Sequence, residues 1–304
     1  MALIAPFYAI WQTAITLLVA QALLFALSVV VVAREAFKRL GTFAGWAIGI
    51  AYGLAWGLQS AISFEFHEVA FAPVLMALAL QALLGERWKT AMFWAATLLL
   101  VKEDLGLTVA MFGVVMFLRG KRLLGFVETL IGAVGFVLVL KVLIPAANPE
   151  GRYDYTARDD LGLSLHTLFL EGQHTKIWML IWLFAITGFL ALRSNITLLV
   201  IPTLLWRLAT SNENYWGTSW QYSAILMPVV FMAMIDAMQK MKRSERAWVR
   251  GWASHNPAVA VVVGLMLLQQ FPLNQLIKPE TYTIPTRAIA ARQAATFIPD
   301  GAIV

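Results

Sequence analysis

The chain has 304 residues, of which 60% are hydrophobic and only 13% charged, whereas soluble globular proteins carry roughly 25% charged residues. This composition excludes a soluble globular protein and indicates an integral membrane protein. The net charge of +6 does not indicate nucleic-acid binding, because the Lys and Arg residues form small clusters between apolar runs. The absence of cysteine excludes disulfides and thiolate metal sites.

Apolar runs, each ended by charges or by Pro, Gly and Asn clusters, predict an all-α, polytopic transmembrane helix bundle of about ten spans. The runs are 14–33, 43–62, 69–84, 88–101, 105–118, 123–144, 177–192, 195–209, 222–239 and 257–271. Several are shorter than the roughly 20 residues that cross a bilayer upright. Residues 88–118 have a second reading, as one span interrupted by charges.

The basic residues predict the topology, because Lys and Arg concentrate in cytoplasmic loops. With the N-terminus outside, every inner loop is basic, whereas most acidic residues lie in the outer segments. Merging 88–118 into one span would move the strongly basic segment 240–250 outside, so the charges favour a break at Lys102–Asp104. We therefore expect a multi-pass plasma-membrane protein with its N-terminus and polar loops on the outer face.

Residues 1–271 are expected to form one transmembrane domain with an outer loop at 145–176. This loop is too long for a simple connector, and loops of such length tend to be functional or disordered. Its aromatic and charged side chains favour function, and Asp154, Tyr155 and Asp159 are candidate acceptor-site residues. The tail, 272–304, is expected on the outer face as the start of a further segment.

The first polar island is Ser63-Phe64-Glu65-Phe66-His67-Glu68. Glu65, His67 and Glu68 place two carboxylates and an imidazole within a short stretch at the outer rim. Such a cluster can supply a general base or two or three metal ligands. The alternative is an interfacial loop in which the His hydrogen-bonds a carboxylate. No further ligand pattern supports a divalent metal, so no metal site is assigned.

The second polar island is Val101-Lys102-Glu103-Asp104-Leu105-Gly106. A lysine among apolar residues at the membrane rim suits a phosphate head group, and Glu103 and Asp104 would set its position and protonation. The alternative is a tight turn in which Lys102 pairs with one of these carboxylates. The spacing does not decide between the two interpretations.

The segment 212–222 predicts an outer loop of aromatic and amide side chains, including Tyr215 and Tyr222. Such side chains bind sugars by stacking on their faces and hydrogen-bonding hydroxyls. Interfacial aromatics explain the composition equally well. The nucleotide-binding glycine patterns, the paired-His helix of zinc proteases and the Gly-x-Ser-x-Gly elbow are absent from the sequence.

Both islands, together with Ile144-Pro145-Ala146-Ala147-Asn148-Pro149 and Ile298-Pro299-Asp300-Gly301, resemble the bacterial membrane-protein family called domain of unknown function 2079. The likeness covers nearly the whole chain. That family looks like a branch of the type-C glycosyltransferases, multi-span enzymes that take a sugar from a polyprenyl-phosphate carrier on the outer face. Lys102-Glu103 followed by Gly106 is similar to a Lys-Glu motif of other members, so the resemblance implies a lipid-phosphate role for Lys102.

The chain departs from the pattern of these enzymes at two places. Members usually begin with one more span and an outer loop that carries an acidic residue, the expected catalytic base, and this chain is expected to start after that loop. Where the resemblance implies a His-Tyr pair at the start of the span at 222, the chain has Gln221-Tyr222.

The leading hypothesis is a membrane-embedded glycosyltransferase that moves a sugar from a polyprenyl-phosphate carrier to an unidentified glycan or protein of the cell envelope. Lys102 would hold the donor phosphate, and Glu65, His67 or Glu68 would orient the acceptor. No nucleotide or soluble cofactor is required, because the carrier phosphate is the leaving group. The alternatives are a transporter or lipid-carrier flippase and a non-catalytic membrane assembly subunit.

Overall fold

The computed structural model is a helical bundle and describes residues 5–148, 151 and 163–298. No β-strand occurs within these ranges, so the all-α prediction is confirmed. The α-helices are α1 (Ala5–Ile10), α2 (Ala14–Leu40), α3 (Thr42–Gly53), α4 (Trp56–Ile62), α5 (Ala72–Leu84), α6 (Trp88–Ala96), α7 (Leu105–Leu118), α8 (Arg122–Leu138), α9 (Ile144–Ala147), α10 (Leu165–Leu170), α11 (Gln173–Ala185), α12 (Ile201–Ala209), α13 (Leu226–Met241), α14 (Ala247–Leu268) and α15 (Thr286–Ala295).

Short helical turns join or extend these helices, and η3 is a turn of π-helix that continues α8 toward α9. The π-helical turn η3 spans Val139–Leu143. The others are 3₁₀ turns: η1 (Glu68–Phe71), η2 (Thr97–Leu100), η6 (Leu190–Arg193), η7 (Asn195–Val200), η8 (Glu213–Tyr215), η9 (Gln221–Ser223), η10 (Pro272–Ile277) and η11 (Pro279–Tyr282).

Each predicted apolar run is mostly helical, but several are divided by turns into shorter helices. The described helices that are long and apolar enough to cross a membrane are Ala14–Leu40, Arg122–Ala147, Gln221–Met241 and Ala247–Leu268. The run 43–62 is divided between α3 and α4. Helix α14 starts well before the predicted residue 257, because its polar first turns bury Val249 and Ala253 against the bundle, a pattern that a hydropathy reading overlooks.

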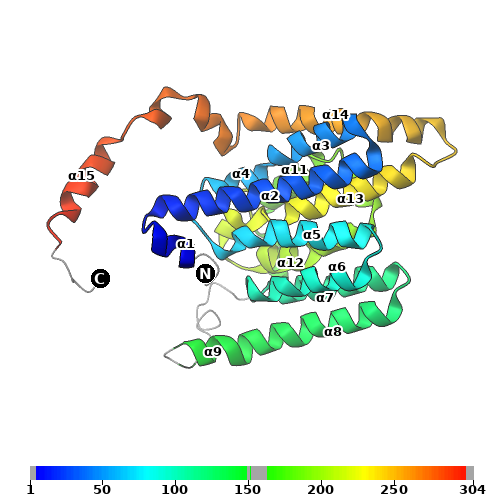
Figure 1. Ribbon diagram of the computed structural model, residues 1–304, viewed down its shortest axis with the longest axis horizontal. Coiled ribbons are helices and arrows are strands. Elements are labelled where there is room, and N and C mark those ends of the chain that lie inside the picture. Colours follow the sequence, from blue (N-terminus) through cyan, green and yellow to red (C-terminus); the bar gives the residue numbers. More distant parts are fainter. Residues whose placement is uncertain (1–4, 149–150, 152–162, 299–304) are drawn as a thin grey trace.

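The predicted break at Lys102–Asp104 is present, since η2 ends at Leu100 and α7 starts at Leu105. Figure 1 shows the turns α2–α3, α5–α6, α7–α8 and α13–α14 together at one end of the bundle. These turns and the helix ends beside them carry most of the basic residues, so this end is called the basic end. Helices α1 and α9 lie at the opposite end, and α15 extends away from the bundle (Figure 1).

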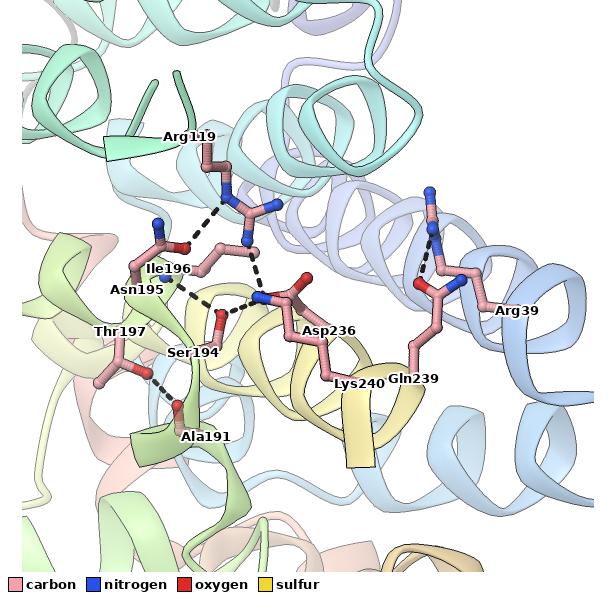
Figure 2. A network of polar contacts seen from close by, with 10 residues as sticks. All are labelled: Arg39, Arg119, Ala191, Ser194, Asn195, Ile196, Thr197, Asp236, Gln239 and Lys240. Atoms are coloured by element: carbon pink, nitrogen blue, oxygen red, sulfur yellow. Dashed lines mark hydrogen bonds and ion pairs between the residues drawn. The ribbon is translucent and has the colours of Figure 1, made fainter. Parts of the chain in front are cut away.

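Helix α13 is the centre of the bundle, with 14 of its 16 residues buried. Near its C-terminus, the Oδ2 atom of Asp236 accepts hydrogen bonds from Arg119 Nη2 at 2.8 Å, Ser194 Oγ at 2.5 Å and Lys240 Nζ at 2.7 Å. Arg119 also donates through Nε to Asn195 Oδ1 at 3.0 Å. Figure 2 shows how this network joins the end of α7 to α13 and to the segment between η6 and η7.

Helices α7 and α8 form a close antiparallel pair through small residues, as membrane helices commonly do. Thr129 Oγ1 of α8 donates to the Ala110 carbonyl of α7 at 3.2 Å. A Cβ added at Gly132 would lie 2.2 Å from the backbone nitrogen of Ala110, so the helices can approach this closely only with glycine there. The opposite face of α8 is apolar and exposed, as expected of a helix that faces lipid.

We expect Gly132→Ala to lower the stability of the protein by about 1–3 kcal/mol, because the extra methyl group forces two backbones apart. The measurement is thermal unfolding in detergent followed by circular dichroism. Gly251→Ala in α14 is the matched control, since a Cβ there meets no atom of the described chain within 4 Å. Equal midpoints for the two variants would contradict the close packing of α7 on α8.

Candidate functional site

A cavity of about 360 Å³ lies at the end of the bundle opposite the basic end, where α7 and α13 begin. Both polar islands contribute to it, together with the loop that follows α12. The residues that line the cavity are His67, Glu68, Lys102, Glu103, Asp104, Leu107, Phe136, Leu140, Leu163, Trp206, Tyr215, Gln221 and Tyr222.

The first island is a turn between α4 and η1 that α2 holds in place. The buried Gln21 side chain donates to the Ala61 carbonyl at 3.0 Å and to the Phe64 carbonyl at 3.4 Å. The Phe64 ring stacks on the His67 ring with centroids 5.1 Å apart. The next residue, Glu68, starts η1, so these contacts present His67 and Glu68 to the cavity.

The second island is the turn that opens α7. The Leu105 amide donates to the Lys102 carbonyl at 3.2 Å, and the Gly106 amide donates to the Glu103 carbonyl at 3.3 Å. A Cβ at Gly106 would lie 2.8 Å from Phe136 Cβ, so the glycine lets α8 approach the turn. Phe136 thereby becomes part of the cavity wall, next to the charged groups.

An aromatic cluster forms a further wall around Lys102. The Lys102 Nζ atom lies 5.4 Å from the centroid of the Trp206 ring and 5.9 Å from that of Tyr222, within the range of cation–π attraction. Tyr215 and Tyr222 pack edge to face with centroids 4.7 Å apart. Flat aromatic faces and phenolic hydroxyls beside an ammonium group are suited to a sugar that carries a phosphate.

Arg207 fixes the loop that carries these tyrosines. Its side chain is fully buried and donates to the Tyr215 carbonyl at 2.9 Å, the Gly217 carbonyl at 2.9 Å and Ser223 Oγ at 3.0 Å. The guanidinium thus satisfies part-buried backbone acceptors that the loop would otherwise leave unpaired. Arg207 does not line the cavity, but its guanidinium carbon lies 5.8 Å from the centroid of the Tyr222 ring, so a positioning role follows for it.

The charge of Lys102 is stabilised by its surroundings. Burial alone disfavours the ammonium form, but the carboxylates of Asp104, Glu103 and Glu68 outweigh it and raise the pKa of Lys102 above its usual value. The Asp104 Oδ1 atom lies 3.9 Å from Lys102 Nζ, which is beyond hydrogen-bond distance. Lys102 is therefore a cation whose hydrogen-bond donors are not consumed by Asp104.

Asp104 is a carboxyl group in an unusual environment. Burial raises its pKa above the ordinary value, although the Lys102 charge acts in the opposite direction. Its Oδ1 atom and the indole nitrogen of Trp206 are both buried and have no hydrogen-bond partner within normal geometry. A proton is accordingly easier to place on Asp104 than on an exposed aspartate.

The structure brings together most of the residues that the sequence singled out. His67, Glu68, Lys102, Glu103, Asp104, Tyr215 and Tyr222 all line the cavity. Glu65 is exposed and is not part of the lining, and its carbonyl oxygen lies 3.0 Å from His67 Nδ1. The candidates Asp154, Tyr155 and Asp159 lie outside the described residues.

Sequence reasoning overlooked Trp206, Arg207 and Phe136. Trp206 lies near the end of the run 195–209, where a tryptophan is usual as an interfacial anchor, and Phe136 belongs to a run with no distinguishing feature. A signal did exist for Arg207, because an arginine inside the apolar run 195–209 needs buried partners. Within the described residues, no group of three or more His, Asp or Glu side chains is arranged to hold a metal ion.

We expect Arg207→Met to lower stability by about 2–4 kcal/mol, because it removes the donor of the part-buried carbonyls of Tyr215 and Gly217 and of the buried Ser223 hydroxyl. Thermal unfolding gives the loss, and limited proteolysis reports whether the segment 210–223 is released. Arg87→Met, at an exposed arginine, is the control. Equal stability and equal cleavage in the two variants would contradict the positioning role.

The comparisons with known proteins identify a family but no characterised relative. A family model described as "Predicted membrane protein (DUF2079)" matches residues 1–304. No curated protein and no solved structure matches the chain significantly. The resemblance seen in the sequence is thus confirmed, and the chain belongs to the family of predicted membrane proteins with domain of unknown function 2079.

Proposed function

We propose that this membrane protein is a glycosyltransferase-like enzyme that uses a polyprenyl-phosphate sugar as donor. The observation that carries the proposal is the position of Lys102, a stabilised cation between carboxylates and aromatic rings. The same proposal assigns about ten membrane crossings to the bundle, with several short helices adding to the four long ones. It also assigns the helix arrangement of the type-C glycosyltransferases, with the cavity around Lys102 on the outer face of the membrane.

The cavity suits an amphipathic donor. Phe136 and Leu140 line one side, and they belong to the segment whose opposite face is apolar and exposed. A prenyl chain in the lipid would run along this segment while its phosphate reaches Lys102. The rings of Trp206, Tyr215 and Tyr222 would then contact the sugar.

The reaction follows from this arrangement. The acceptor oxygen attacks the anomeric carbon, the bond from that carbon to the phosphate oxygen breaks, and the polyprenyl phosphate leaves with the bonding electrons. Lys102 stabilises the negative charge that develops on the phosphate. Glu68 or Glu103 takes the acceptor proton as general base, and water is excluded by the aromatic wall.

The carboxyl groups place a condition on donor binding. One ammonium faces three carboxyl groups in the lining, so a phosphate also meets repulsion there. A proton on Asp104 reduces this repulsion, and burial already favours that proton. Donor binding is therefore expected to be linked to protonation of Asp104.

A transporter or lipid-carrier flippase is the alternative function, and one observation suits it. Glu128 is fully buried in α8, and neither of its carboxyl oxygens has a hydrogen-bond partner, as in a proton-carrying group. A transporter also needs a path through the bundle, whereas α7 and α13 fill the space between their ends with buried apolar side chains such as Phe112, Met116 and Phe231. This packing favours the enzyme, and an assembly subunit without chemistry remains the third reading.

Lys102→Ala is expected to lower sugar transfer from a polyprenyl-phosphate donor by at least about 100-fold, because the charge on the leaving phosphate loses its stabilising cation. The rate of transfer by the full-length protein is measured with a labelled donor. Binding of polyprenyl phosphate, followed by quenching of tryptophan fluorescence, should weaken in parallel. The control is Lys89→Ala at an exposed lysine of the basic end. Unchanged turnover in Lys102→Ala would refute the phosphate role.

Affinity for polyprenyl phosphate is expected to increase as the pH falls toward the raised pKa of Asp104, because protonation of Asp104 removes a negative charge beside the ligand. The raised pKa of Asp104 moves this effect to higher pH than an exposed aspartate would show. Asp104→Asn is permanently neutral, so its affinity should depend less on pH than that of the wild type. Since the ligand titrates equally in both experiments, identical pH profiles would contradict the linkage.

A further inference from the structure

A second cavity, of about 500 Å³, lies at the basic end of the bundle and has no role in the proposed transfer reaction. It lies between the ends of α2, α5, α7 and α13. The residues that line it are Arg39, Leu83, Leu84, Glu86, Trp88, Arg119, Lys121, Asp236, Gln239, Lys240 and Arg243.

Positive charge predominates in this basic cavity. Its lining holds five cationic side chains and two carboxylates. A third carboxylate, Glu35, pairs with Arg39 from the preceding turn of α2. An excess of cations remains after these pairs are counted, and it lines a cavity that is partly open to solvent.

Part of the cation set is held rigidly by the network in Figure 2. Arg39 donates through Nη1 to Gln239 Oε1 at 2.8 Å, and Arg119 pairs with Asp236 at 2.8 Å. The side chains of these arginines are only 13% and 16% exposed. The cavity thus has preorganised walls, with Arg39 and Arg119 set in place before any ligand arrives.

Lys121 and Arg243 complete the cavity from its exposed side. The Nζ atom of Lys121 lies 5.4 Å from the centroid of the Trp88 ring. Since the cations outnumber the carboxylates, these two exposed side chains are available to contact an anion in the cavity. Such an arrangement of fixed and adaptable cations is suited to a phosphate group.

We propose that the basic cavity between the ends of α2, α7 and α13 binds the phosphate of an anionic lipid head group. A lipid is the source of this phosphate because Arg39 and Lys240 lie in the last turns of helices that are long enough to cross a membrane. Trp88, a residue type that favours the membrane interface, lines the same cavity. Basic pockets between membrane helices bind phosphate-bearing head groups in this way.

The test compares two double variants of the full chain that remove the same charge. Lys121→Gln with Arg243→Gln changes the lining but leaves the Asp236 network intact. Lys89→Gln with Arg122→Gln changes exposed residues of the basic end that do not line the cavity. Each protein is reconstituted in nanodiscs of phosphatidylcholine with a minor share of phosphatidylglycerol, and retained lipid is counted by native mass spectrometry. Inorganic phosphate is titrated in a second arm.

The wild type and the control variant are expected to retain phosphatidylglycerol in preference to phosphatidylcholine. The lining variant should retain at least about fivefold less, because two cations near the head group are lost. Displacement of the lipid by inorganic phosphate would show that the site recognises the phosphate itself, whereas no displacement would show that the acyl chains contribute. Equal retention by the two double variants, or no preference in the wild type, would overturn the proposal.

Discussion

Charges inside an apolar bundle are stable only where each finds partners, and the architecture of this protein depends on that constraint. At the basic end, Asp236 gathers Arg119, Ser194 and Lys240 around one carboxylate oxygen. At the opposite end, Arg207 is buried against loop carbonyls. The helices between them are held in register by these two polar clusters and packed by small and apolar side chains.

The cavities at the two ends of the bundle differ in the balance of their charges, so each is suited to different chemistry. The cavity around Lys102 holds one cation among carboxyl groups and aromatic rings, which suits a reaction with proton transfer. The basic cavity holds an excess of cations without the tyrosine pair, which suits retention of an anion.

The candidate site also depends on backbone proximity that no single segment reveals. Gly106 permits α8 to pass close to the turn of Lys102, and Gly132 continues the contact further along both helices. The glycines thus place the apolar wall of Phe136 beside charged groups. Arg207, one residue after Trp206, sets the position of the tyrosines through its hydrogen bonds to the backbone of their loop.

The sequence by itself determined the helical class, the membrane location, the family and the break at Lys102–Asp104, because hydropathy and charge are local properties of the chain. It also singled out most of the polar residues that line the cavity around Lys102. Tertiary structure decided that the two islands meet with the loop of Tyr215 and Tyr222, that Glu65 is left outside, and that α14 begins earlier than its apolar run. These outcomes depend on which helix ends lie side by side, a property of long-range packing that spacing along the chain does not encode.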